Sequence, residues 1–157
     1  MTTRILFVCL GNICRSPTAE GVAKTHQSHR NFQFESAGTG AWHVGEAPDR
    51  RAQGEAALRG YDLSDQRARQ ISADDFHAFD HIVAMDTANL EALTAMRPTN
   101  ARAEISRLLD HAPDKAVIGP DGTRRTDVPD PYYEGAFDLT LDLIEVGVDG
   151  LLSRIGR

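Results

Sequence analysis

The feature that most constrains this fold is a short apolar run followed at once by a loop and a helix start. Residues 5–8 are continuously apolar, which is typical of a central strand covered on both faces. Residues 9–16 indicate a tight loop, and Ser16-Pro17 supplies an N-cap followed by proline at the first helical position. We therefore expect a buried parallel strand, a loop at its carboxyl end, and a helix over about 17–29.

The rest of the chain alternates strand and helix signals. Further strands are expected around 32–36, 81–85 and 105–109. Further helices are expected over 48–59, 72–79, 87–97 and 137–155, with Thr87 capping the third of them and a loop over 110–134. This alternation predicts the α/β class, with a doubly wound four-stranded parallel sheet and helices on both faces. Ligands bind such sheets beyond the carboxyl ends of the strands.

Length, charge and cysteine content limit the class of protein. The 157 residues suit a single domain over 1–157, and the net charge of −6 argues against nucleic-acid binding. No apolar stretch approaches 18 residues, so we expect neither export nor a membrane span. Two cysteines cannot form a disulfide framework, and a reducing cytoplasm fits them best. Because the net charge is negative, any phosphate group that the chain binds must be held by one concentrated site.

Cys9 and Arg15 stand at the two ends of the expected loop. The main-chain N–H groups of a loop between a strand and a helix can surround an oxyanion, and the helix N-terminus adds positive potential. Gly11 is expected to permit the backbone turn. The predicted phosphate-binding residues are Leu10, Gly11, Asn12, Ile13, Cys14, Arg15 and Ser16.

The same positive potential favours a thiolate at Cys9, which would make it a nucleophile at neutral pH. Arg15 offers a planar guanidinium that can hold two phosphoryl oxygens at once. A cysteine at the end of a buried strand is more often inert, and C-x5-R alone is a weak pattern. Its position at a strand-to-helix turn makes the pattern strong.

Residues 8–17, VCLGNICRSP, resemble the signature loop of the low-molecular-weight protein tyrosine phosphatases. Further similar segments follow in order: 36–39 with Trp42 and Gly45, 67–70, 79–80, 85–86 with 89–90, and 130–133. The resemblance implies a protein-tyrosine phosphatase that hydrolyses phosphotyrosine and aryl phosphates through a phosphocysteine intermediate. It implies no cofactor and no metal.

The resemblance also assigns roles near the loop. Asp130 matches the general acid, and a tyrosyl leaving group, with a pKa near about 10, gains roughly 10²–10⁴-fold from a positioned proton donor. Without the resemblance, residues 127–131 would indicate only a proline-rich turn. The aromatic residues that resemble the walls of the substrate slot are Trp42, Tyr132 and Tyr133.

Several polar residues resemble supports of the loop. Ser16 resembles a hydroxyl that hydrogen-bonds the cysteine sulfur, although N-capping is its simpler role. Asn12 and Ser36 resemble braces of the loop. Gln66 stands where the family commonly has a histidine that supports the loop through groups matching Asn12 and Glu20. Glutamine cannot take a proton, so loop rigidity and pH dependence are expected to differ.

Cys14 has three interpretations: an inert loop residue, a metal ligand together with Cys9, or a redox partner of Cys9. No further cysteine exists, and the six histidines show no convincing ligand arrangement. The resemblance favours a reversible Cys9–Cys14 disulfide that protects Cys9 from over-oxidation.

Two other functions compete with the phosphatase. An arsenate reductase on the same fold would need further cysteines, and none follows Cys14. A non-catalytic phosphate-binding module would not need Cys9, Arg15 and Asp130 together. The expected partners are a phosphotyrosine-containing protein as substrate and inorganic phosphate or other oxyanions as inhibitors, with no nucleic acid and no membrane. We expect a monomer or a weak dimer.

Overall fold

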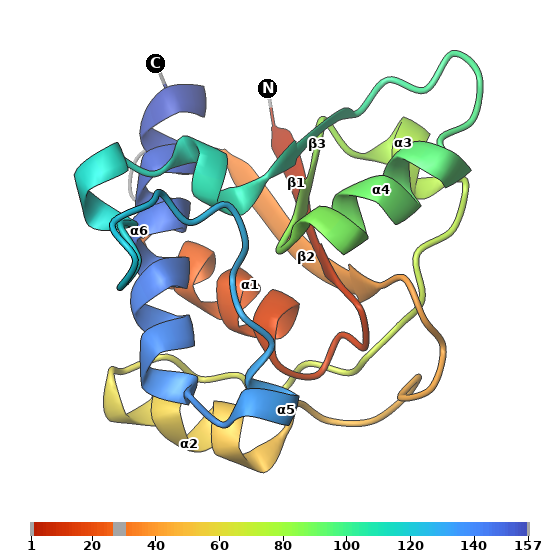
Figure 1. Ribbon diagram of the computed structural model, residues 1–157. Helices are drawn as coiled ribbons and strands as arrows, with labels where there is room; N and C mark the ends of the chain where they lie inside the picture. Colours follow the sequence, from red (N-terminus) through yellow and green to blue (C-terminus); the bar gives the residue numbers. More distant parts are fainter. Residues whose placement is uncertain (1, 27–30, 157) are drawn as a thin grey trace.

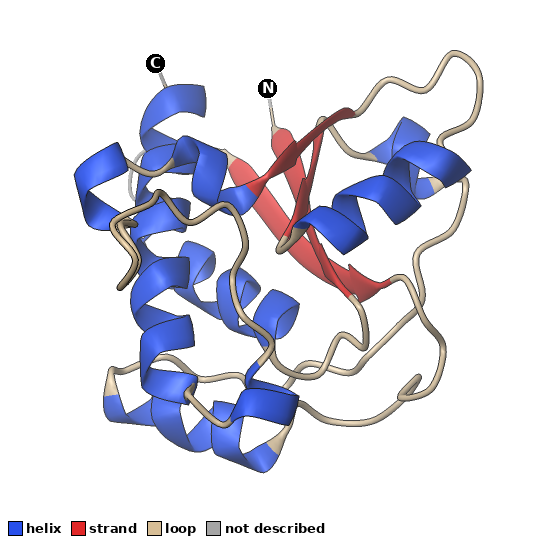
Figure 2. Ribbon diagram, viewed as in Figure 1, coloured by secondary structure: helices blue, strands red, loops and turns tan. Residues whose placement is uncertain are grey.

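The computed structural model describes residues 2–26 and 31–156, except for the side chains of 133 and 134. It places a four-stranded parallel sheet, in the order β2-β1-β3-β4, between two layers of helices (Figures 1 and 2). The strands are β1 (Thr3–Cys9), β2 (Phe32–Gly38), β3 (His81–Ala84) and β4 (Glu104–Arg107). The predicted fold class is confirmed.

The helices expected from the sequence are present with shifted ends, and one further short helix lies at residues 131–134, where a loop was expected. They are α1 (Arg15–His26), α2 (Arg50–Leu58), α3 (Asp75–Ala78), α4 (Thr87–Met96), α5 (Pro131–Glu134) and α6 (Phe137–Ile155). Two 3₁₀ helices, η1 (Leu108–His111) and η2 (Asp114–Ala116), occupy part of the expected long loop. Thr87 was expected to cap α4, but Asp86 is the cap, and its side chain accepts from the Asn89 N–H.

β1 lies in the middle of the sheet because its residues are apolar on both faces. Ile5 and Phe7 join the cluster that includes α1 and α6, whereas Leu6 and Val8 join the cluster that includes α3 and α4. All four side chains are fully buried. Figure 1 shows α1 and α6 on one side of the sheet and α3 and α4 on the other.

The strand order places a topological switch point beside the end of β1. β1 pairs in parallel with β2 on one side and with β3 on the other, so Val8 lies opposite both Ala37 and Ala84. Connections from neighbouring strands therefore diverge just beyond Cys9. A crevice at this position is where doubly wound sheets bind ligands.

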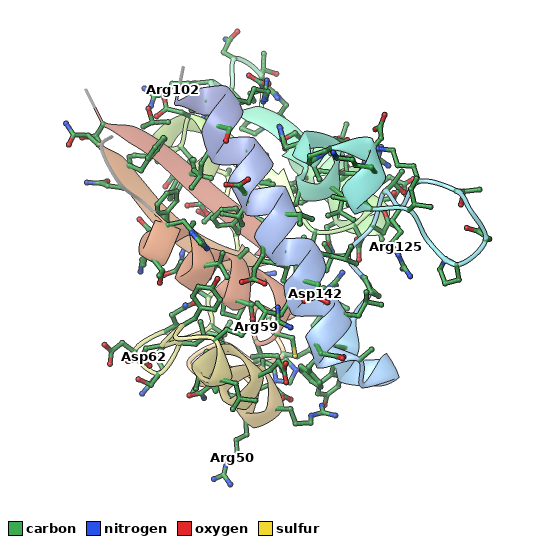
Figure 3. All side chains as sticks on the ribbon, turned by 90° about the vertical axis from the view of Figure 1, so that its left-hand side faces the viewer. Arg50, Arg59, Asp62, Arg102, Arg125 and Asp142 are labelled. Carbon is green, nitrogen blue, oxygen red and sulfur yellow. The ribbon has the colours of Figure 1, made fainter. Side chains whose placement is uncertain are left out.

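α6 is fastened to the end of α2 by a charged cluster. Arg59 donates to Asp142 over 2.7 Å and to Glu145 over 2.6 Å, and Figure 3 shows Arg59 and Asp142 facing each other. The Tyr61 hydroxyl also donates to Glu145. Burial and this hydrogen bond raise the pKa of Tyr61 to about 12. Tyr61 therefore remains a neutral donor at physiological pH.

Within the described parts of the chain, no helix is both long and apolar enough to cross a bilayer.

His111 joins the end of α6 to the sheet edge in a way that depends on pH. Its Nε2 lies 2.9 Å from the Ser106 hydroxyl, and its Nδ1 accepts from Arg154 over 3.1 Å. Burial, reinforced by the charge of Arg154, lowers the pKa of His111. The unfolded chain therefore takes up this proton first as the pH falls. The stability contributed by neutral His111 is complete above about 6.5 and is lost as the pH falls toward the folded-state pKa.

We expect the free energy of unfolding to fall between pH 7.5 and pH 5.5, and to fall less in a His111→Asn variant. Urea denaturation at the two pH values measures both. His81, whose pKa burial also lowers, remains in the variant and contributes its own dependence. An unchanged difference between the two pH values in His111→Asn would contradict the assignment.

Candidate active site

The loop after β1 directs polar hydrogens toward the sulfur of Cys9. The Asn12 N–H donates to Cys9 Sγ over 3.3 Å, and the Ser16 hydroxyl lies 3.0 Å from the same sulfur. Cys9 is only 3% exposed, yet it lines a pocket together with Arg15 and Asp130. The sulfur of Cys9 is therefore held by polar contacts at the base of this pocket.

Two sequence expectations about this loop were wrong. Ser16 does not cap α1, because the helix already begins at Arg15 and the hydroxyl faces the sulfur instead. The left-handed residue of the loop is Asn12, with φ of 57°, and not Gly11. A Cβ at Gly11 would lie 3.1 Å from Cδ2 of His43, so that the His43 side chain would have to shift by a few tenths of an ångström.

The side chain of Asn12 holds the loop in this conformation. Its Nδ2 donates to Ser16 over 2.8 Å and to Ser36 over 3.0 Å, and its Oδ1 accepts from the Arg69 N–H over 3.0 Å. Ser36 in turn donates to Glu20 over 2.7 Å. A satisfied buried network of this kind makes a loop rigid.

Gln66 reaches the same network from the far side of α1. Its Nε2 donates to the carbonyl oxygen of Pro17 over 2.8 Å, and its Oε1 lies 3.4 Å from the Ser36 hydroxyl. It therefore touches the loop support through Ser36. A protonated histidine could not accept from Ser36 in the same way.

Arg15 is buried and held in one orientation. Its Nη1 donates to Asp86 over 2.6 Å and to the carbonyl oxygen of Val128 over 3.0 Å. Burial alone would lower the pKa of Arg15, but the adjacent Cys9 and Asp86 raise it above its usual value. The guanidinium is therefore a fixed positive charge beside the sulfur.

The sequence analysis used Asp86 only as part of a resemblance and missed its contact with Arg15. A usable signal was present, because Asp86 lies two residues after the end of the buried strand β3. The carboxyl ends of adjacent parallel strands meet at one edge of the sheet, and β3 is the neighbour of β1.

Asp130 lies beside the other terminal nitrogen of the Arg15 guanidinium. Its Oδ1 accepts from the Tyr132 N–H over 3.0 Å, which caps α5, and its Oδ2 lies 3.4 Å from Arg15 Nη2. The side chain keeps 26% of its surface exposed and lines the pocket. A carboxyl group in this position can exchange protons with a bound ligand and with water.

The pocket has a volume of about 340 Å³ and an aromatic rim. Trp42 is 71% exposed and its ring lies over Gly40, while Tyr132 is 43% exposed on the facing wall. His43, which was not predicted from the sequence, also lines the pocket, and its ring contacts that of Tyr132 edge-on with 6.2 Å between the centroids. The side chain of Tyr133, which was expected in this rim, lies outside the described residues.

Comparison with known proteins identifies the family. The family profile described as low molecular weight phosphotyrosine protein phosphatase matches residues 4–157. The low molecular weight protein-tyrosine-phosphatase YfkJ of Bacillus subtilis is 38% identical over 157 residues, covering 98% of this chain and 96% of that one. The chain belongs to the low molecular weight phosphotyrosine protein phosphatase family.

Solved structures agree with this assignment. A protein tyrosine phosphatase of Entamoeba histolytica, crystallised with Hepes in its active site, matches with a TM-score of 0.85 and 33% identity over 98% of this chain and 97% of that one. A Drosophila arginine phosphatase matches with a TM-score of 0.82 and 31% identity over 98% of both chains. The present chain is thus a hydrolase of phosphotyrosine, and the family acts through a phosphocysteine.

The second cysteine of this phosphatase has a different environment from the first. Burial, together with the nearby carboxylate of Asp49, raises the pKa of the Cys14 thiol far above its usual value. Both Cys9 and Cys14 are free thiols in the structure. Among the residues that the structure describes, no cluster of three or more His, Cys, Asp or Glu side chains could hold a metal ion.

We expect Asp86→Asn to lower kcat/KM of the phosphatase for 4-nitrophenyl phosphate about 10-fold, because one amide oxygen must then serve both Arg15 and the Asn89 N–H. Inorganic phosphate should also inhibit this variant more weakly. Asp80→Asn is the matched control, since Asp80 precedes β3 and bonds Arg4 and Arg102 away from the pocket. Equal losses in the two variants would contradict a specific role for Asp86.

Proposed function

We propose that phosphotyrosine hydrolysis here proceeds by two successive displacements at phosphorus, with Cys9 as the nucleophile of the first and the leaving group of the second. The Cys9 thiolate attacks phosphorus while Asp130 gives its proton to the phenolic oxygen, which leaves as the neutral phenol. The carboxylate of Asp130 then takes a proton from a water that attacks the phosphocysteine, and the thiolate departs. The observation that carries this proposal is that Cys9, Arg15 and Asp130 line one pocket at the end of β1.

The loop supplies the positive potential that the transferred phosphoryl group requires. The main-chain N–H groups of residues 10–16, the N-terminus of α1 and the guanidinium of Arg15 converge on the place where charge spreads in the transition state. The Ser16 hydroxyl, 3.0 Å from the sulfur, stabilises the thiolate as it leaves in the second step. Asn12, Ser36 and Gln66 act as supports of the loop.

The rim favours an aromatic phosphomonoester. Trp42 and Tyr132 flank the entrance, and the apolar side chain of Ile13 lines the pocket beside Cys9. Burying an aromatic ring contributes about 1.5–3 kcal/mol, or roughly 10- to 100-fold in kcat/KM. Phosphoserine has no ring to place there, and phosphoarginine has a flexible charged chain.

A single peptide carrying phosphotyrosine, phosphoserine or phosphoarginine at one position tests this preference. We expect kcat/KM to be highest for phosphotyrosine, by roughly 10-fold or more over each alternative. The structural similarity to an arginine phosphatase makes phosphoarginine the decisive comparison. Faster release of phosphate from phosphoarginine would overturn the proposed substrate.

We place the phosphatase in a reducing cytoplasm, in keeping with its two free thiols. It acts as one domain over 1–157 and as a monomer or weak dimer. Its partners are phosphotyrosine-containing proteins, and inorganic phosphate and other oxyanions inhibit it by occupying the loop.

Cys14 is proposed as the resolving thiol for oxidised Cys9. Peroxide converts the Cys9 thiolate to a sulfenic acid, and Cys14 then displaces water from that sulfur to form a disulfide. We expect peroxide inactivation of the parent enzyme to be reversed by added thiol, and that of Cys14→Ser to be largely irreversible. Recovery of phosphatase activity after dithiothreitol measures this. Equal recovery in the two enzymes would remove the redox role.

A further inference from the structure

The segment that carries Asp130 is fastened to the corner between β3 and α4, defined here as residues 85–87. Asp127 Oδ1 accepts from the Thr87 N–H over 2.9 Å and from the Thr87 hydroxyl over 2.7 Å. These two residues are 40 positions apart in the sequence. The contact therefore closes a large loop of the chain onto the edge of the sheet.

The next residue repeats the attachment through its main chain. The Val128 N–H donates to the carbonyl oxygen of Met85 over 2.9 Å, and the Val128 carbonyl accepts from Arg15 over 3.0 Å. The Val128 side chain is fully buried. Residues 127 and 128 are thus fixed on the corner, and Asp130 follows two residues later.

Thr87 is itself held in place from β4. Arg107 Nη1 donates to the Thr87 hydroxyl over 3.0 Å, and the other nitrogens of the same guanidinium bond Asp110. That hydroxyl, as an acceptor from Arg107, has its own hydrogen free for Asp127. The preceding residue, Asp86, holds Arg15. One corner of the fold therefore orients both the phosphate-binding guanidinium and the segment leading to Asp130.

We propose that Asp127 is a positioning residue that sets the place of Asp130 through its two hydrogen bonds to Thr87. This inference rests on the proposed role of Asp130 as the general acid. Proton transfer needs the carboxyl within about 2.6–3.2 Å of the leaving oxygen, and a misplacement near 1 Å can cost about 10²-fold. Without the Asp127 carboxylate, only the main-chain hydrogen bonds of Val128 would attach this segment to the corner, which leaves room for a misplacement of this size at Asp130.

The test uses the dependence on the leaving group. Phenyl phosphate releases a phenol as basic as tyrosine and needs the acid, whereas 2,4-dinitrophenyl phosphate releases a stable anion and does not. We expect Asp127→Ala to lower kcat/KM about 10- to 100-fold for phenyl phosphate and less than about 3-fold for 2,4-dinitrophenyl phosphate. Asp127→Asn keeps an oxygen acceptor for Thr87, so its kcat/KM for phenyl phosphate should stay close to that of the parent.

Asp121→Ala is the matched control for general effects on the loop. Asp121 Oδ1 also accepts from a threonine N–H and hydroxyl, those of Thr123, over 3.0 and 2.7 Å, but only two positions away. The Asp121→Ala variant should have an unchanged kcat/KM for both substrates. If Asp127→Ala lowers kcat/KM equally for both substrates, the residue is merely structural and the proposal fails.

Asp130→Asn separates failure of this inference from failure of the proposed function. If Asp130→Asn lowers kcat/KM for phenyl phosphate far more than for 2,4-dinitrophenyl phosphate and Asp127→Ala does not, only the positioning role of Asp127 is overturned. If Asp130→Asn leaves kcat/KM for phenyl phosphate unchanged, the assignment of Asp130 as the general acid is wrong, and the proposed function fails before this inference is reached. In the double variant, Asp127→Ala should add less than about 3-fold to the loss on phenyl phosphate, because residues acting through one group are not additive. A multiplied loss would contradict the proposal.

Discussion

A Cys9→Ser variant is expected to lose phosphotyrosine hydrolysis almost completely, by about 10⁵-fold or more in kcat, as when the nucleophile is removed from other covalent enzymes. A serine hydroxyl remains protonated where the thiol ionises, so no nucleophile is present at neutral pH. The change replaces one atom by a slightly smaller one and leaves the donors of the loop in place. Steady-state release of phosphate from a phosphotyrosine peptide measures the effect.

Binding of inorganic phosphate by calorimetry separates loss of chemistry from loss of folding. Cys9→Ser should still bind phosphate, because the main-chain N–H groups and Arg15 are unchanged. Cys14→Ser serves as the comparison and should keep most of its turnover. Turnover by Cys9→Ser within about 10-fold of the parent would place the nucleophile elsewhere.

An Asp130→Asn variant is expected to lose roughly 10²–10⁴-fold in kcat/KM for phenyl phosphate, since the amide cannot protonate the leaving oxygen. Asparagine is the right replacement because its Oδ1 can still accept from the Tyr132 N–H that caps α5.

A matched leaving-group series provides the control for Asp130→Asn. The loss should shrink as the leaving phenol becomes more acidic, because a stable phenolate needs no proton. An equal loss for all phenols would contradict the role of Asp130.

The fold and the loop were predictable because both depend on local patterns. The apolar run before Cys9 and the alternation of strands and helices determine the class, order and approximate bounds of the elements. The position of Cys9 at the carboxyl end of the central strand follows from the same reasoning. Capping details were less accurate, since Ser16 and Thr87 each have a hydroxyl that the tertiary structure uses for another contact.

The contacts between distant segments could not be predicted from one sequence. Asp86 and Asp127 acquire their partners only when the sheet brings β3 beside β1 and the segment before α5 closes over that edge. The periodicity of apolar residues along the chain contains no information on which distant segments come into contact. His43 was missed for a similar reason, because its place in the pocket depends on how the loop after β2 folds back toward the phosphate loop.

Limited alkylation at pH 7, followed by peptide mapping by mass spectrometry, tests the central claim most directly. If Cys9 is the ionised nucleophile within an anion-binding loop, iodoacetamide should label Cys9 rapidly and Cys14 hardly at all, and inorganic phosphate should protect Cys9. Slow labelling of both cysteines at similar rates, or labelling of Cys9 that phosphate does not reduce, would contradict the account.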